Sequence, residues 1–238
     1  MKLSVIRYIK KVFVRLRLHV LFIPVAGFIS QVLYLTKFSA WVNKNKKIPF
    51  NDFPGKWDYN KRFTLYDWVT NNEGLSAEPI NYMEFGVAEG HSFRWFVKQN
   101  THPESRFYGF DTFTGLPEDF GVYKKGTFDR NMQVPILTDT RVKFFPGLFQ
   151  HTVPGFLEEM NKGCRNVIMM DADLYSATLY ALTSLAPFLK KNDIIFFDEF
   201  AVPTHEFKAF IDFTQSYYFD FQLIAAASNY YFAAFKVG

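Results

Sequence analysis

The chain has 238 residues, of which 49% are hydrophobic, 20% aromatic and 21% charged, with a formal net charge of +4. This composition excludes a disordered protein, because there is enough apolar surface to bury a core. A single cysteine, Cys164, excludes a disulfide framework and any multi-cysteine zinc or iron–sulfur site. The length suits one domain with a short appendage.

The charge is unevenly distributed along the chain. Residues 1–47 contain ten basic residues and no acidic one, whereas residues 48–238 contain 17 basic and 23 acidic residues, a net charge of −6. The basic character therefore belongs to the N-terminal segment alone. A nucleic-acid-binding protein would carry its basic patch on the main domain, so this class is not expected.

The first twenty residues predict a basic amphipathic helix. Ile6, Ile9 and Phe13 recur at helical spacing, and Arg7 and Lys11 fall on the opposite face. Helices of this kind favour anionic membrane surfaces.

An apolar run over residues 18–35 follows this helix. Pro24 and several polar residues weaken the prediction of a transmembrane span, and the long basic region argues against a signal peptide. Three interpretations stay open. The run could be a helical hairpin broken at Pro24 that packs on the main domain or on another subunit, a segment on a membrane surface, or a true span. Residues 43–55 are polar and contain two prolines, so we expect an extension over 1–55 and a main domain over 56–238.

The main domain alternates between helices and strands. Helices are predicted at 59–71, 92–99, 152–161, 174–189 and 205–216. Strands are predicted at 81–86, 106–111, 141–145, 166–171, 193–198, 219–225 and 230–236. This alternation predicts an α/β fold with a mostly parallel sheet. Only four residues separate the last two strands, so they must pair in an antiparallel way.

Ligands of such sheets bind at the carboxyl ends of the strands. The first predicted strand ends in the pattern E-x-G-x-x-x-G, formed by Glu84, Gly86 and Gly90. Glycines there let a ligand approach the backbone, and the pattern suits a nucleoside better than a dinucleotide. The second strand ends in Asp111, which could bind the hydroxyls of a ribose or cap the following turn.

Four acidic residues follow two later strands. They are Asp171, Asp173, Asp198 and Glu199. Carboxylates held together raise one another's pKa unless a cation neutralises them, and Mg²⁺ prefers such oxygen ligands. We therefore expect a magnesium site, against the alternative that Asp173 caps a helix and Glu199 points to water.

Other candidate groups are ambiguous. His91, His151 and His205 lie after or between predicted strands, where each could act as a base, although histidines in such places are more often surface or capping residues. Cys164 is expected to pack in the core.

Several segments together resemble a known family. YMEFGVAEGHS, YGFDTFTGLPEDF, FFPGLFQHTVP, MMDADLYSAT and FFDEF occur in this order between residues 82 and 200. They are similar to the macrocin O-methyltransferase-like family of class I S-adenosylmethionine-dependent methyltransferases. The resemblance implies a Rossmann-like class I methyltransferase sheet and Mg²⁺-assisted methylation of a hydroxyl on a sugar or a related natural product.

The resemblance also implies roles for individual residues. S-adenosylmethionine would be bound by Glu84, Gly86, Gly90, Ser92 and Asp111. Asp171, Asp198 and Glu199 would hold the metal, and Asp171, Asp173 or His151 would accept the substrate's proton. Two departures stand out, because the family usually has Asp-Asp-Tyr where Asp198-Glu199-Phe200 stands, and often an acid in place of His151.

Two other function classes compete with this interpretation. A nicotinamide-dependent oxidoreductase could use a similar sheet, although the third glycine of its fingerprint is missing. A non-catalytic scaffold on a membrane surface would use only the basic segment, which leaves the acids at the strand ends without a role. We expect a cytoplasmic enzyme that takes a small hydroxyl-bearing acceptor. Residues 1–47 could hold it at the periphery of the membrane, and the enzyme could form a homo-oligomer.

Overall fold

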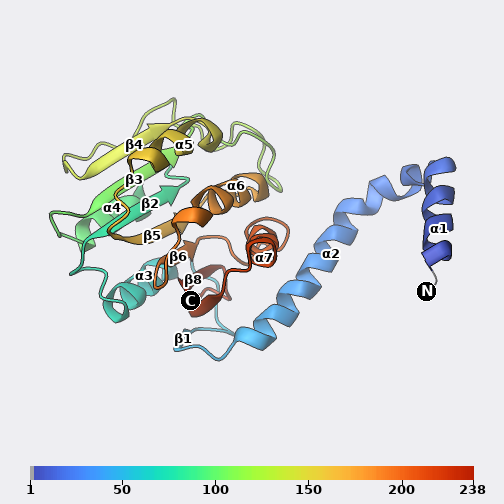
Figure 1. Ribbon diagram of the computed structural model, residues 1–238, viewed down its shortest axis with the longest axis horizontal. Coiled ribbons are helices and arrows are strands. Elements are labelled where there is room, and N and C mark those ends of the chain that lie inside the picture. The colour runs from blue at the N-terminus through green and yellow to red at the C-terminus, as the bar shows by residue number, and fades with distance from the viewer. Residues whose placement is uncertain (1–2) are drawn as a thin grey trace.

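The computed structural model describes residues 3–238 and has one eight-stranded sheet covered by helices on both faces (Figure 1). The strand order is β1-β7-β8-β6-β5-β2-β3-β4. The strands are β1 (Phe50–Asn51), β2 (Ile80–Phe85), β3 (Arg106–Asp111), β4 (Val142–Pro146), β5 (Arg165–Met170), β6 (Ile194–Phe197), β7 (Phe221–Ala227) and β8 (Phe232–Val237). All pairings are parallel except those of β8 with β6 and β7. The predicted Rossmann-like fold, with an antiparallel strand near the C-terminus, is confirmed.

The helices form two layers around the sheet. One layer contains α3 (Lys61–Asn72) and α4 (His91–Gln99), and the other contains α5 (Phe149–Glu159), α6 (Tyr175–Leu185) and α7 (Glu206–Tyr217). A short 3-10 turn, η1 (Ala186–Phe188), follows α6. Because helices cover both faces, β2 and β6 are buried along their whole length, as their continuous apolar sequences predict.

Backbone hydrogen bonds continue past the ends of the central strands. Gly86 N–H donates to the Phe110 carbonyl over 2.9 Å, and Asp171 N–H donates to the Phe85 carbonyl over 2.9 Å. Asp198 N–H donates to the Met170 carbonyl over 3.0 Å. The carboxyl ends of β3, β2, β5 and β6 are therefore level, and the residues that follow them face one another.

The N-terminal helices differ from the sequence prediction. The structure has α1 (Leu3–Arg15) and α2 (His19–Asn45), with the break at Arg17, whose φ is +50°. α2 runs unbroken through Pro24, so of the three interpretations left open, a hairpin broken at that proline is wrong. Arg17 can take the left-handed conformation in the turn, whereas Pro24 loses only one backbone bond inside a long helix.

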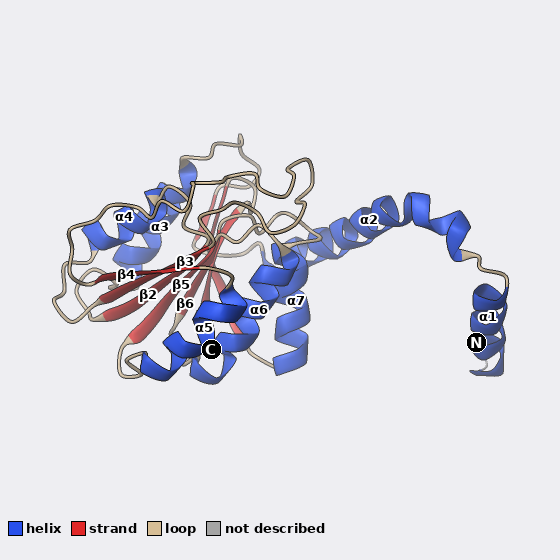
Figure 2. Cartoon of the chain, turned by 90° about the horizontal axis from the view of Figure 1, so that it is seen from above, coloured by secondary structure: helices blue, strands red, loops and turns tan. Residues whose placement is uncertain are grey.

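Only the C-terminal half of α2 is seated on the sheet layer (Figure 2). Tyr34, Phe38, Trp41 and Val42 share one face of the helix and pack against the core. The Trp41 ring lies 5.1 Å from the Phe200 ring. Aromatic packing on one stripe therefore holds this half of α2 in place.

The segment between α2 and α3 is bound to the sheet. β1 pairs with β7, which the sequence did not predict, and Asp58 N–H donates to Ser228 Oγ over 2.8 Å. Lys61 also pairs with Asp52. These contacts attach residues 50–61 to the turn between β7 and β8. The proposed division at residue 55 stays a prediction.

Replacing Trp41 by alanine is expected to lower the free energy of unfolding by about 2–4 kcal/mol, because the ring packs against several core aromatics. Phe28→Ala is the matched control, since that ring is 73% exposed and should leave stability within about 0.5 kcal/mol. Urea unfolding of both variants measures the difference. Equal stabilities would mean that α2 does not dock on the sheet layer.

Candidate functional site

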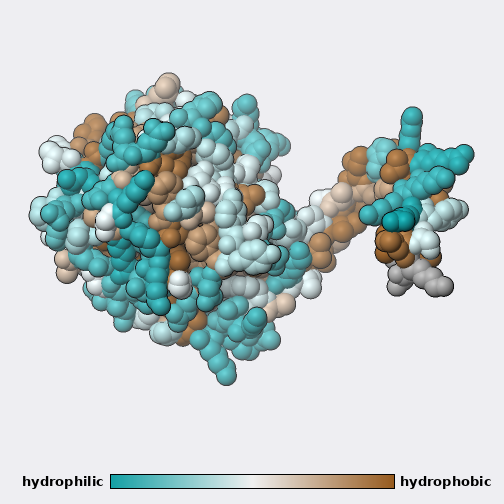
Figure 3. Space-filling model, in the orientation of Figure 1, coloured by the Kyte–Doolittle hydropathy of each residue, from teal (hydrophilic) through white to brown (hydrophobic). Residues whose placement is uncertain are grey.

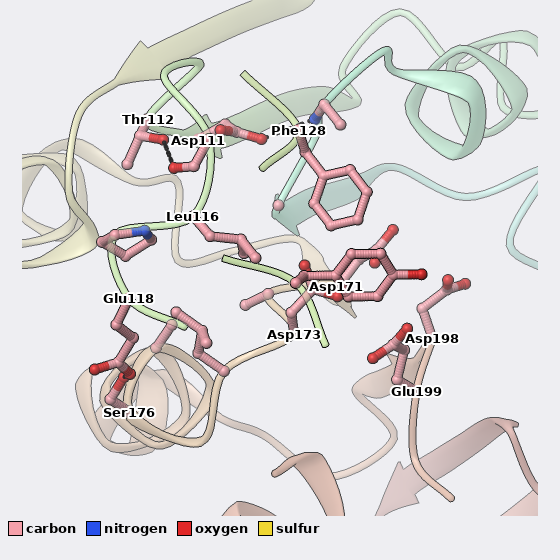
Figure 4. Close-up of a pocket in the computed structure, with 18 of the residues that line it drawn as sticks. Asp111, Thr112, Leu116, Glu118, Phe128, Asp171, Asp173, Ser176, Asp198 and Glu199 are labelled. Carbon is pink, nitrogen blue, oxygen red and sulfur yellow. Dashed lines mark hydrogen bonds between the residues drawn. The ribbon is translucent and has the colours of Figure 1, made fainter. Parts of the chain in front are cut away.

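A pocket of about 630 Å³ opens at the carboxyl ends of β2, β3, β5 and β6 (Figure 4). A volume of this size suits a small organic ligand. Gly86 and Asp111 lie on its wall, and Asp171, Asp173, Asp198 and Glu199 line it together. The structure thus brings the acids at the predicted strand ends into one cavity.

The turn after β2 can form only with glycine at position 86. Gly86 has φ of +94°, a conformation that other residues rarely adopt. A Cβ atom there would lie 1.7 Å from the Asp171 carbonyl oxygen, which is an impossible contact. The glycine therefore allows β2 and β5 to end side by side, with bare backbone facing the pocket.

Glu84 supports this turn from behind the pocket wall. Its side chain is fully buried and accepts hydrogen bonds from Tyr82 and, over 2.8 Å, from Ser92 Oγ. Burial is the main cause that raises the pKa of Glu84 to about 8. Glu84, Gly90 and Ser92 do not line the cavity, whereas Gly86 and Asp111 do.

Asp111 lies on the wall, but the loops around it already use most of its bonding capacity. Its Oδ2 atom accepts from Val87 N–H and Ala88 N–H, both over 2.8 Å, and Oδ1 accepts from Phe113 N–H over 2.7 Å. A carboxylate has about four lone-pair sites, so about one stays free for a ligand hydroxyl. Both interpretations of Asp111 are therefore compatible with the structure, since one carboxylate can shape the turn and still bind a ligand.

Asp173 and Glu199 are neighbouring carboxyl groups on the wall of the pocket. Burial and the neighbouring charge of Glu199 raise the pKa of Asp173 to about 8, and burial raises the pKa of Glu199 to about 7. Asp173 does not cap α6, where no side chain caps the first turn. Its φ of +58° is strained for a non-glycine residue and directs the backbone so that Asp173 lines the pocket.

Asp198 is held by α3, which the sequence did not reveal. Arg62 Nη1 lies 3.6 Å from Asp198 Oδ2, and Tyr66 donates to Oδ1 over 3.1 Å. The Arg62 guanidinium partly offsets the burial that raises the pKa of Asp198. Arg62, Tyr66 and Val69 have the spacing of one helix face, but that pattern alone predicts burial and says nothing of an acid partner.

The predicted metal ligands offer suitable atoms without forming a metal centre in this arrangement. Within residues 3–238, no three His, Cys, Asp or Glu side chains are close enough together to hold an ion. Among the same residues, no donor binds the Asp171 carboxylate. Burial and the neighbouring charge of Asp198 raise the pKa of Asp171 well above its usual value. Glu199 Oε2 is buried and has no hydrogen-bond partner among residues 3–238. Hard oxygen donors with excess negative charge fit a divalent cation chemically.

The predicted base His151 lies on the outside of α5. It is exposed and does not line the cavity, whereas its neighbours Phe149 and Gln150 do. A single step along α5 therefore separates His151 from the residues that line the cavity. His205 lies outside the cavity too, with its ring 4.8 Å from the Phe120 ring.

Aromatic side chains form the rim of the pocket, and the sequence did not single them out. Trp57 and Tyr59 come from the segment before α3, Tyr123 and Phe128 from the loop after β3, and Tyr231 from the turn before β8. Trp57 is 61% exposed and Phe128 is 49% exposed, although both are large apolar groups. Such rings offer flat surfaces to a ligand that lies partly outside the cavity.

Comparison with known proteins identifies the fold and the domain. Residues 83–200 match the family model of a methyltransferase domain. The structure superimposes on the calicheamicin methyltransferase CalS11 with a TM-score of 0.57 and 24% identity, over 75% of this chain and 78% of that one. It superimposes on the O-methyltransferase NovP with a TM-score of 0.53 and 21% identity, over 74% and 77% of the two chains. At these identities the likeness shows the fold.

Two curated relatives share sequence with this chain. One is 8-demethyl-8-(2,3-dimethoxy-alpha-L-rhamnosyl)-tetracenomycin-C 4'-O-methyltransferase from Streptomyces olivaceus, 30% identical over 165 residues, which are 60% of this chain and 61% of that protein. The other is mycinamicin III 3''-O-methyltransferase from Micromonospora griseorubida, 29% identical over 144 residues, which are 56% and 52%. The chain thus spans between half and two thirds of the length of these relatives. The resemblance seen in the sequence is confirmed.

Gly86→Ala is expected to destabilise the fold by about 3 kcal/mol or more, because the new methyl group would collide with the Asp171 carbonyl and strain the turn. Gly155→Ala is the control, since nothing lies within 4 Å of a Cβ at that helical position. The control should change the free energy of unfolding by no more than about 1 kcal/mol in either direction. Thermal and urea unfolding compare the two. A Gly86→Ala protein as stable as the control would contradict the described packing of β2 against β5.

Proposed function

We propose that this chain, which belongs to the class I methyltransferase family, is an S-adenosylmethionine-dependent O-methyltransferase that acts on a hydroxyl group of a sugar. The observation that carries the proposal is the single pocket in which the Gly86 turn, Asp111 and the acids after β5 and β6 meet. The named sugar O-methyltransferases among its relatives support the acceptor class. The family match disfavours the competing nicotinamide-dependent oxidoreductase and the non-catalytic scaffold.

The pocket fits the methyl donor on two observations. Gly86 and Ala88 present backbone without large side chains, and Asp111 keeps about one acceptor site for a ribose hydroxyl. When bound, S-adenosylmethionine supplies an electrophilic methyl group on sulfur. The chain's contribution is to hold the acceptor oxygen in line with that methyl group, and such positioning is worth up to about 7–11 kcal/mol of the barrier. Glu84, Gly90 and Ser92 act from behind by fixing the turn.

Asp173 is the base that this geometry favours. Its carboxyl lines the pocket, and its pKa of about 8 lies near neutral pH, where a general base works best. The neighbouring charge of Glu199 adds to burial in holding the pKa of Asp173 in this range. Asp171 is the second candidate, since it lines the same cavity, and His151 would need to come from the far side of α5.

We include Mg²⁺ in the proposal, held by Asp171, Asp198 and Glu199 after their side chains turn toward one another in the pocket that they line. The free Asp171 carboxylate and the orphaned Glu199 oxygen supply hard donors, and Asp198 is already partly compensated by Arg62. A bound divalent cation would offset the mutual repulsion of these acids and lower the pKa of an acceptor hydroxyl.

We also assign the extension and the location. Residues 56–238 would be the methyltransferase domain, and residues 1–55 an extension that keeps a cytoplasmic enzyme at the periphery of a membrane or joins it to another copy. The basic composition of residues 1–47 supports this proposal, and α2 is long and apolar enough to cross a membrane by length and composition.

Asp111→Ala is expected to weaken binding of S-adenosylhomocysteine by about tenfold or more, because both a ribose contact and the shape of the Gly86 turn are lost. Isothermal titration calorimetry measures the affinity. Asp67→Ala, an exposed change on α3, should bind like the unaltered protein. An unchanged affinity for Asp111→Ala would refute the ribose role.

Asp198→Asn is expected to abolish the calorimetric signal of Mg²⁺ binding, because it removes the charge of one proposed metal ligand. The affinity for S-adenosylhomocysteine should stay within about twofold, because asparagine has nearly the same shape as aspartate. Glu159→Gln, on the surface of α5, is the control. A collapse of cofactor affinity in Asp198→Asn would show that the metal site has been misplaced.

A further inference from the structure

The N-terminal half of α2 projects from the body of the protein without a covering surface. Residues 19–29 are all exposed, and they include Leu21 at 71% and Phe28 at 73% exposure. Residues 20–29 include no charged or polar side chain, so the sequence leaves no polar face there, and apolar side chains are visible on the face seen in Figure 3. A helix that is apolar all round is stable only when something apolar encloses it.

The preceding helix α1 is built to lie beside such an environment. It has basic side chains on one face, apolar ones on the other and no buried residue. The Phe13 ring stacks on the Phe22 ring of α2 at 5.6 Å, which joins the apolar sides of the two helices. Residues 3–47 hold no acidic residue, whereas residues 48–238 carry a net charge of −6. An anionic surface matches this pattern.

A lipid bilayer fits these two helices better than a second copy of the chain. Two copies would bring two sets of α1 cations together, and residues 3–47 contain no acid to pair with them. A helix pair would also cover one stripe of each helix and leave the rest of the apolar surface exposed. Acyl chains enclose the helix on every side, and anionic headgroups pair with the basic side chains.

The length of the free segment limits how deep α2 can reach. Gln31 is already bonded to Thr204 over 2.9 Å, and Tyr34 packs on the core. The twelve free residues of 19–30 rise by about 18 Å, against a hydrocarbon core of about 30 Å. While docked, α2 can enter one leaflet and cannot cross the bilayer.

The exit point of α2 sets the orientation of the pocket. Thr204 belongs to the loop that follows β6, at the same edge of the sheet as Asp198 and Glu199. Residues 19–30 therefore continue past the carboxyl ends of the strands, on the side where the pocket opens, and both ribbon views show α2 leaving on that side (Figures 1 and 2). A bilayer that receives this segment would therefore lie on the pocket side of the molecule.

We propose that α1 and the free half of α2 dock the enzyme on an anionic membrane with the pocket facing the bilayer, so that the acceptor is a sugar attached to a membrane lipid. This inference rests on the proposed function for its chemistry and on the N-terminal helices for its geometry. The aromatic rim, with Trp57 and Phe128 exposed, would then meet the sugar as it emerges from the headgroup region.

The docking is tested by flotation of the full chain with vesicles. Vesicles of phosphatidylcholine with 25 mol% phosphatidylglycerol should bind the protein, and pure phosphatidylcholine should bind it far less. The triple variant Arg7→Gln, Lys11→Gln, Arg15→Gln should lose affinity on the order of 100-fold, because each cation near an anionic surface is worth about 1 kcal/mol. Phe28→Asp should weaken binding without altering stability, since that side chain is exposed.

A matched triple variant controls for general charge. Lys98→Gln, Lys162→Gln and Lys191→Gln remove exposed cations from the main body, away from the pocket, and should leave vesicle binding unchanged. Equal loss in both triple variants, or no binding to anionic vesicles, would overturn the docking. A stable dimer or larger oligomer that Phe28→Asp dissociates in the absence of lipid would show that a second copy covers α2 instead.

The acceptor is tested with S-adenosylmethionine labelled in its methyl group. Enzyme and donor are incubated with the membrane fraction and, separately, with the soluble fraction of cells that make this protein. We expect label in the organic extract of the membranes, reduced by the basic-residue triple variant. Label confined to water-soluble sugars would overturn the lipid-linked acceptor and leave the proposed function intact. No label in either fraction, with the donor shown to bind, would count against the proposed function itself.

Discussion

The structure depends on the level alignment of four parallel strand ends. The hydrogen bonds from Gly86, Asp171 and Asp198 to the neighbouring strands fix where each chain leaves the sheet. Each of these residues is the first after its strand, so a shift of one residue in any pairing would move an acid from the pocket to the opposite face. The alignment in turn requires glycine at position 86, because any larger residue would push β2 away from β5.

This alignment brings several carboxyl groups together in the pocket, and two different arrangements stabilise them. Asp198 receives a buried partner from α3, where Arg62 and Tyr66 contact its two oxygens. Asp173 and Glu199 instead lie near each other without such a partner, and burial raises the pKa of both carboxyl groups. The first arrangement fixes a charge, while the second keeps a pair that can take up or release a proton near neutral pH. In the proposed function, binding and proton transfer therefore use different acids in one cavity.

The sequence predicted the fold well because the fold depends on local patterns. Continuous apolar runs predicted the buried strands, and the four-residue link before β8 required an antiparallel pair. It predicted the acids of the site because they directly follow strands. It could not predict the Arg62–Asp198 pair, which joins residues 136 positions apart, or the outward direction of His151, which one step around a helix decides. The two-residue strand β1 was also missed, because its pairing with β7 depends on long-range contacts of the linker.

The packing of α2 on the sheet layer connects this helix to the pocket. Trp41 and Phe38 rest on Phe200, and Phe200 is the residue directly after Asp198 and Glu199. Its N–H also donates to the carbonyl of Tyr231, whose hydroxyl bonds Glu199 over 2.5 Å. Any force that tilts α2 is therefore transmitted within one residue to the acids of the pocket. The position of the docked half of α2 and the position of these acids are therefore fixed by the same packing.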